Sequence, residues 1–214
     1  TDVSGNFVFN RDGRKEYLSE EERLAFKVAL ESQNVALVDL YLDHFSGKPV
    51  YGVVAPIYYF NDETKVLIGF LVERRDPKYM LYPLIQQWPV PSQSAETLIV
   101  RKQKDKALWL NNLRFKDDAA LKFSQGLSET KLPAVSVILG NKGLFFGVDY
   151  RRVEVISFLS DIPGTCWFMV AKVDLNEVYQ KVFKNISLQI IISLLAVILV
   201  LAGMVFLLKE IALM

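Results

Sequence analysis

The C-terminal part of the sequence contains a long run without a charged residue. From Ile186 to Leu208 no Asp, Glu, Lys or Arg occurs, and a run of about 23 residues is roughly 35 Å long as a helix. The hydrocarbon core of a bilayer is about 30 Å thick, whereas a buried helix of a soluble protein seldom stays wholly apolar for more than about 14 residues. The run therefore predicts a membrane-spanning helix at 186–208, with the lipid bilayer as its partner.

The charges beside this run leave its orientation open. Lys184 precedes it and Lys209 follows it, so the positive-inside rule favours neither side. Further upstream, Asp174 can cap a helix, with Glu177 three residues later as its capping partner. We therefore predict one unbroken helix over about 175–210, which joins the preceding part of the chain to the membrane.

The composition excludes one class of partner and leaves the compartment open. The 214 residues carry 25 Lys and Arg against 24 Asp and Glu, a net charge of +1, whereas phosphate binding requires a clear basic excess. We therefore expect no nucleic acid partner. The single cysteine, Cys166, cannot form an intrachain disulfide, which fits either a reducing compartment or an outside domain without disulfides. The sequence begins at Thr1, and we expect it to be a segment of a longer chain.

The part that precedes the uncharged run divides into two similar units. In the first, Ser19 and Glu22 form a capping box that predicts a helix, and alternating apolar residues predict strands before and after it. The expected elements of this unit are a strand at 7–9, a helix at 19–32 and strands at 35–42, 50–60 and 65–73.

A linking helix and the second unit follow. Asp76 and Pro77 are typical of an N-cap and a first helical residue, and Pro83 is expected to kink or split this helix. Short strands joined by hairpin turns, with few helices, predict an α+β fold with an antiparallel sheet in each unit. The expected elements of the second unit are strands at 96–102, 106–113, 120–124, 143–150, 153–160 and 166–173, and a helix at 132–139.

Two stretches of the sequence resemble a known family. The first is Arg75-Asp76-Pro77, continued by LYPLIQQWP at 81–89 and SAETLIVR at 94–101. The second is GVDYR at 147–151, continued by IPGT at 162–165 and WFMVAKVD at 167–174. Over roughly residues 30–180 the chain resembles the double Cache, PAS-like extracytoplasmic sensor domains of bacterial histidine kinases and diguanylate cyclases.

The resemblance implies an architecture and a location. It implies two PAS-like lobes, a preceding transmembrane and stalk helix outside this sequence, and a homodimer. It also implies a soluble part that is periplasmic or extracellular, an anchor in the bacterial inner membrane, and a kinase or cyclase output domain inside. Family members usually have Gly where Arg152 stands, so the turn there is expected to be rebuilt. The implied boundaries are 1–75 for the membrane-distal lobe, 76–92 for the linking helix, 93–174 for the membrane-proximal lobe, and 175–210 for the helix that includes the span.

Candidate ligand-binding residues are polar or aromatic side chains within the expected strands, because a PAS-like pocket lies between the sheet and its helices. An acid such as Asp39 needs a partner if it is buried, either a ligand cation or an internal Arg or Lys, and we favour the internal one. Asp149 and Tyr150 can also form a structural pair, and Trp109 can be a core residue. The candidates are Asp39, Tyr41, Tyr51, Tyr58, Arg101, Trp109, Asn111, Asp149 and Tyr150.

The sequence contains no pattern typical of a catalytic or metal site. His44 has no neighbouring His or Cys and is expected in a surface loop, and Cys166 is expected to be a small buried strand residue. We expect no cofactor and no enzymatic activity in this segment. The predicted function is the binding of an unidentified small ligand, with a conformational change passed through the C-terminal helix. The alternative is a dimerisation or partner-docking module without such a ligand.

Overall fold

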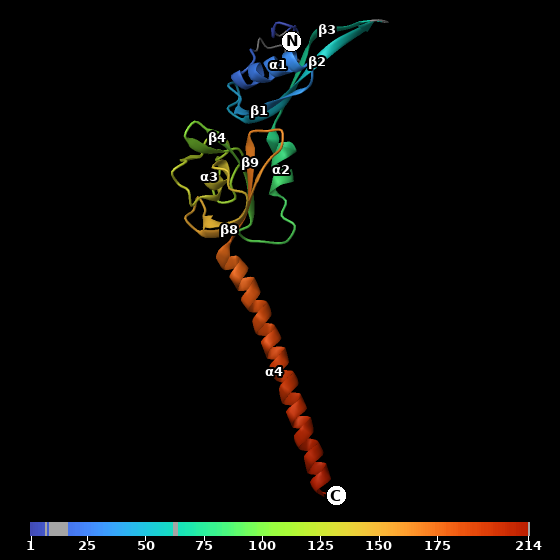
Figure 1. Cartoon of the computed structure of the whole chain (residues 1–214), viewed down its shortest axis with the longest axis vertical. Coiled ribbons are helices and arrows are strands. Elements are labelled where there is room, and N and C mark those ends of the chain that lie inside the picture. Colours follow the sequence, from blue (N-terminus) through green and yellow to red (C-terminus); the bar gives the residue numbers. More distant parts are fainter. Residues whose placement is uncertain (7, 9–16, 62–63, 214) are drawn as a thin grey trace.

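The chain is built from two antiparallel sheets and a long C-terminal helix (Figure 1). The computed structural model describes residues 1–6, 8, 17–61 and 64–213, and within these ranges it describes the side chains of all but 181, 184, 185, 187, 188 and 205–213. The strand expected at 7–9 lies outside the described residues. As predicted, the fold is α+β with antiparallel sheets.

The first sheet carries helix α1 on one face. Ser19 Oγ accepts a hydrogen bond from the N–H of Glu22 at 3.1 Å, and Glu22 Oε2 accepts one from the N–H of Ser19 at 2.9 Å, so the predicted capping box is confirmed. Phe26 of this helix packs on Phe70 of the sheet, with ring centroids 4.7 Å apart. The elements are α1 (Glu20–Ser32), β1 (Ala36–Leu42), β2 (Pro49–Asn61) and β3 (Thr64–Arg75), and the strand order is β1-β2-β3.

The link between the sheets is broken at a different residue from the one expected. A short 3₁₀ helix, η1 (Pro77–Tyr79), begins after Asp76, whose side chain accepts a hydrogen bond from the N–H of Lys78. The break falls at Met80, and α2 (Leu81–Gln86) follows. The predicted split is thus confirmed, and it falls three residues before Pro83, which has no N–H to donate to the carbonyl of Tyr79 and lies in the first turn of α2.

The second sheet has six strands in the order β6-β5-β4-β9-β8-β7, all pairing antiparallel. Helix α3 lies against one face, over a core that includes Leu98, Trp109 and Val170. The other face, near β4 and β5, packs on Leu40 of β1. The elements are β4 (Glu96–Gln103), β5 (Lys106–Trp109), β6 (Ser124–Gly126), α3 (Pro133–Ile138), β7 (Gly143–Val148), β8 (Glu154–Asp161) and β9 (Trp167–Asp174).

Two strands of this sheet differ from the expectation. The strand expected at 106–113 ends at Trp109. Beyond it, the N–H of Ile99 donates to the side-chain oxygen of Asn111 at 2.7 Å instead of to a backbone carbonyl of the neighbouring strand. The strand expected at 120–124 instead occupies Ser124–Gly126. The alternation of apolar and polar residues therefore predicts the strand positions to within a few residues, whereas contacts of individual side chains determine where the strands end.

The chain continues from β9 directly into α4 (Leu175–Leu213), which leaves the folded body as a single rod (Figure 1). The predicted unbroken helix is thus confirmed. The expected capping arrangement differs, since the carboxylate of Glu177 accepts hydrogen bonds from the hydroxyls of Ser92 and Ser94. Over the residues that the structure describes, no helix is long and apolar enough to cross a membrane. The membrane span at 186–208 stays a prediction.

Candidate ligand-binding site

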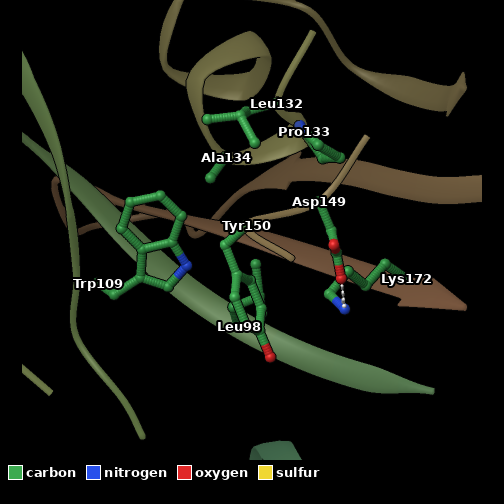
Figure 2. Close-up of a pocket in the computed structure, with 8 residues that line it drawn as sticks. All are labelled: Leu98, Trp109, Leu132, Pro133, Ala134, Asp149, Tyr150 and Lys172. Carbon is green, nitrogen blue, oxygen red and sulfur yellow. Dashed lines mark hydrogen bonds and ion pairs between the residues drawn. The ribbon is translucent and has the colours of Figure 1, made fainter. Parts of the chain in front are cut away.

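A small cavity lies between α3 and the six-stranded sheet (Figure 2). The first residues of α3 form one wall, and side chains from three strands and from the turn after β7 form the others. Its volume is about 10 Å³ for the centre of a water molecule, close to the minimum that one buried water needs. The lining residues are Leu98, Trp109, Leu132, Pro133, Ala134, Asp149, Tyr150 and Lys172.

A glycine holds the wall of α3 close to the sheet. The N–H of Val148 donates to the carbonyl of Lys131 at 3.1 Å, which fixes the segment before α3 against β7. A Cβ on Gly147 would lie 2.3 Å from that same carbonyl oxygen. Only glycine therefore allows this close approach of two backbones, and the approach positions Leu132 and Ala134 over the cavity.

The polar side of the cavity is a buried cluster of opposite charges. Lys172 is 1% exposed, and its Nζ donates to Asp149 Oδ2 at 2.8 Å and lies 3.0 Å from Glu96 Oε2. Glu96 and Lys172 stand directly opposite each other in the β4–β9 pair. Tyr150 Oη donates to Glu96 Oε2 at 3.0 Å. Each buried charge thus has a partner, which is the condition for burying it at all.

The environment of this cluster shifts two pKa values in opposite directions. Burial acts to raise the pKa of Asp149, but hydrogen bonds and positive charge from Lys172 and Arg151 outweigh it and hold the pKa below its ordinary value of 3.8. Burial, and then the negative charge of Glu96, raise the pKa of Tyr150. At neutral pH the cluster therefore contains a charged carboxylate at Asp149 and a neutral phenol at Tyr150.

One polar group in the cavity has no hydrogen-bond partner within the described part of the chain. Trp109 is 1% exposed, and its indole N–H is unpaired. Figure 2 shows that the nitrogen edge of the ring faces the space beside Tyr150, with the Asp149–Lys172 pair beyond it. An unpaired buried donor is rare in folded proteins and is usually explained by a water or ligand acceptor.

The charged cluster continues to the first residues of α4. Arg151 donates from Nε to Asp149 Oδ2 at 2.6 Å and from a terminal nitrogen to Asp174 Oδ1. Asp174 is the last residue before α4, and its backbone N–H donates to Ser94 Oγ at 3.0 Å. A chain of hydrogen bonds and ion pairs therefore links the wall of the cavity to the start of the long helix.

Two of the predicted site residues meet at the junction of the two sheets. Arg101 forms an ion pair with Asp39 at 2.5 Å, and the indole N–H of Trp167 donates to the same carboxylate at 2.6 Å. Asp39 thus has the internal partner that was favoured from the sequence. Cys166 lies beside it, with Sγ 3.4 Å from Asp39 Oδ2, and is exposed, so its predicted burial was wrong.

The remaining candidates make separate internal contacts. Tyr41 Oη donates to Glu22, which is fully buried and also bonded by Arg74. Tyr58 Oη donates to the carbonyl of Gln33. Tyr51 packs against the Leu40 cluster, and Asn111 caps β5 as described above. Of the nine candidates, Trp109, Asp149 and Tyr150 are the ones that the structure brings together at the cavity.

Sequence reasoning missed Glu96 and Lys172, although a signal was present. Lys172 stands two residues after Val170, and Glu96 two residues before Leu98, so both charges fall on the face of their strands that carries core residues. A charged residue on the buried face of a strand needs a partner of opposite charge. The acid on the buried face of β4 and the lysine on the buried face of β9 therefore predict each other as partners.

Comparison with solved structures gives the same fold. The ligand-binding domain of the Pseudomonas aeruginosa PAO1 amino acid chemoreceptor PctB, in complex with L-Arg, aligns over 83% of this chain and 70% of its own length, at 13% identity and a TM-score of 0.51. The ligand-binding domain of the Pseudomonas fluorescens chemoreceptor CtaA, in complex with L-isoleucine, aligns over 84% and 69%, at 13% identity and a TM-score of 0.51. The extracellular domain of a candidate histidine kinase, mmHK1S-Z3, aligns over 81% and 62%, at 15% identity and a TM-score of 0.51.

No family model and no curated protein matches the sequence. The chain spans 62–70% of the length of the three solved domains. All three are ligand-binding or extracellular domains. The chain has the fold of these three domains, which is consistent with the resemblance stated from the sequence.

Proposed function

We propose that this chain senses a small ligand on the outer side of a bacterial membrane, as part of a histidine kinase or diguanylate cyclase receptor. The observation that carries the proposal is the unpaired indole N–H of Trp109, which faces a cavity with a buried Asp149–Lys172 pair. Binding sites of this kind combine an apolar lining with a few converging polar groups. The PctB and CtaA domains of the same fold are solved with amino acids bound.

The proposed organisation follows the two sheets. The membrane-distal lobe comprises 1–75, the linking helix 76–92 and the membrane-proximal lobe 93–174, which agrees with a three-stranded sheet in the first and a six-stranded sheet in the last. The helix 175–210 then continues into the membrane at 186–208. The uncharged sequence of that run supports the span.

A ligand in the cavity has a direct physical route to α4. Asp149 lines the cavity, Arg151 bridges it to Asp174, and Asp174 directly precedes the helix. A ligand that binds one arrangement of this cluster more tightly than another shifts the balance between them. We infer that the shift moves the first turn of α4, which Glu177 anchors to Ser92 and Ser94.

A thermal-shift screen of the chain in detergent micelles against small metabolites tests the proposal. A ligand at 100 times its dissociation constant adds about 2.7 kcal/mol to the free energy of unfolding. For a domain of this size that raises the melting temperature by roughly 5–10 °C. A well-folded chain that no compound stabilises would remove the support for ligand sensing.

The second candidate function is homodimerisation without a small ligand. Leu144 of β7 and Phe158 of β8 are direct partners in the sheet, and Phe146 lies on the same face two residues on. Their exposed fractions are 64%, 55% and 59%, which is high for apolar side chains on one sheet face. Analytical ultracentrifugation of the wild type and of Phe158→Ser tests it: a dimer that dissociates only in the variant supports this function.

A further inference from the structure

A group of hydrogen bonds around Asp39 ties the first sheet to the second. Asp39 Oδ2 accepts from Arg101 of β4 at 2.5 Å, and its Oδ1 accepts from the indole N–H of Trp167, the first residue of β9, at 2.6 Å. Arg101 also donates to the carbonyl of Leu40 at 3.0 Å. We call the side chains of Asp39, Arg101 and Trp167 the clasp. The clasp fixes β1 of the first sheet against two strands of the second.

Helix α2 packs at the same junction between the sheets. Its residues Leu81 and Ile85 lie against an apolar cluster that includes Leu40 of β1 and Trp167 of β9. Protein interiors are close-packed, so side chains that share a cluster cannot move independently of one another. A change in how the two sheets pack at the clasp therefore also changes the position of α2.

The segment after α2 runs from this junction to the start of α4 (Figure 1). It contains Pro89 and Pro91, and each proline ring fixes its own φ and restricts the residue before it. Arg114 orders the end of the segment by donating to the carbonyls of Ser92 at 3.1 Å and of Ala95 at 2.8 Å. The segment is therefore stiff, and it passes on a displacement of α2 instead of absorbing it.

The end of this segment is bonded to one carboxylate of α4. Glu177 accepts from the hydroxyl of Ser92 at 2.8 Å, and from the hydroxyl and the N–H of Ser94 at 2.5 and 2.9 Å. Hydrogen bonds to a charged acceptor are roughly twice as strong as those between neutral groups. We call Glu177, Ser92 and Ser94 the latch. The latch joins the first turn of α4 to the segment that begins at the clasp.

We propose that a change in the packing of the two sheets at the clasp moves the first turn of α4 through the segment 81–94 and the latch. This inference rests on the proposed sensing function and adds a second input to it. The route through Arg151 starts at the cavity in the second sheet, whereas this route starts at the first sheet and needs no molecule in the cavity. The three-stranded sheet thereby controls α4 as well.

Spin labels on the full chain in detergent micelles measure the coupling. Cys166 is the single cysteine, so Cys166→Ser gives a background for labels at two exposed positions, Lys142→Cys before β7 and Gln180→Cys in α4. Their distance, from pulsed electron spin resonance, reports the position of α4 relative to the six-stranded sheet. Asp39→Asn loses the charge that pairs with Arg101, and we expect it to shift the mean distance by about 1–2 Å, a usual size for helix displacements.

Two further variants identify the route. In a chain that also carries Glu177→Ala, we expect Asp39→Asn to leave the distance where Glu177→Ala alone puts it. Glu73→Gln is the matched control, because it neutralises an acid of the same sheet whose ion pair with Arg75 is exposed, and we expect no shift from it. Trp167→Phe removes the indole donor from the clasp and keeps an aromatic ring, so it repeats the test if Asp39→Asn does not fold.

Two results would overturn the coupling. One is a folded Asp39→Asn or Trp167→Phe chain in which α4 keeps its position. The other is a shift of α4 that persists in full without Glu177, since the motion then bypasses the latch. The thermal-shift screen decides separately on the proposed function. A stabilising ligand together with an unmoved α4 leaves ligand sensing in place and this route wrong, whereas a moved α4 without any stabilising compound supports the route and removes the support for ligand sensing.

Discussion

Lys172 Nζ lies 2.8 Å from Asp149 Oδ2, and both side chains are 1% exposed. The pair joins β9 to the turn that follows β7, and Glu96 contacts Lys172 from the neighbouring strand β4. A buried pair of this kind stabilises a fold little compared with an apolar replacement of both partners, but its disruption leaves an uncompensated charge. The cluster is therefore sensitive to the loss of any one member.

Replacement of Lys172 by Met is expected to destabilise the soluble part by about 3–5 kcal/mol, because two carboxylates lose their shared buried cation. Denaturant unfolding of the full chain in micelles, followed by tryptophan fluorescence, measures the change. Lys122→Met is the matched control. It removes an exposed pair with Asp118, and such pairs contribute about 0–1 kcal/mol. Equal losses in the two variants would show that the Lys172 cluster does not support the fold.

The bridge from the cavity to α4 predicts energetic coupling between Arg151 and Asp174. A double-mutant cycle with Arg151→Ala and Asp174→Asn is expected to give an interaction of about 1–3 kcal/mol, since both side chains are partly buried and directly bonded. The neighbouring pair Arg152 and Glu129 is exposed, and its cycle is expected to give less than about 1 kcal/mol. An interaction energy near zero between Arg151 and Asp174 would contradict the proposed route from the cavity to α4.

The lowered pKa of Asp149 predicts a stability that depends on pH. Its folded pKa lies below the ordinary value of 3.8, so its contribution is complete above about pH 4 and is lost as the pH falls through the folded pKa. The difference in unfolding free energy between the wild type and Asp149→Asn should therefore narrow in acid. Acid unfolding curves of both proteins measure it. A difference that stays constant down to pH 2–3 would mean that Asp149 is not the titrating group.

Arg152 adopts a left-handed backbone with φ of 66° at the turn where the resembling family has Gly. Arg152 thus has a backbone conformation that favours glycine, and its N–H donates to the carbonyl of Asp149 at 2.9 Å. Arg152→Gly is expected to be more stable than Arg152→Ala by about 0.5–1 kcal/mol, because Ala keeps the strain and both variants lose the ion pair with Glu129. A higher melting temperature for Arg152→Ala than for Arg152→Gly would contradict this expectation and show that the turn changes its conformation when Arg152 is replaced.

The order and type of most described elements follow from local patterns in the sequence. The capping box at Ser19, the alternation that predicts β1 to β3, and the run that predicts α4 each act within a few residues of one another. The end of β5 was misplaced, because it depends on a hydrogen bond from the N–H of Ile99 to the Asn111 side chain. Such contacts reach across the fold and leave no local pattern.

The candidate site shows the same limit more strongly. Polar character within an expected strand selected Asp39, Asp149 and Tyr150 as candidates, and each of them has an internal partner in the structure. It could not tell a ligand from an internal Arg, and the structure pairs Asp39 with Arg101. The decisive feature is the unpaired donor of Trp109, which depends on how five segments pack and cannot be read from composition or periodicity.

Hydrogen exchange of the full chain, in lipid nanodiscs, with and without a stabilising ligand from the thermal screen, tests most directly whether ligand binding reaches α4. If ligand binding reaches α4, exchange slows at the cavity, in 132–135 and 149–151, and also changes in the first turn of α4 at 175–178. Protection at the cavity alone, with identical exchange in the first turn of α4, would contradict the proposed transmission of the signal.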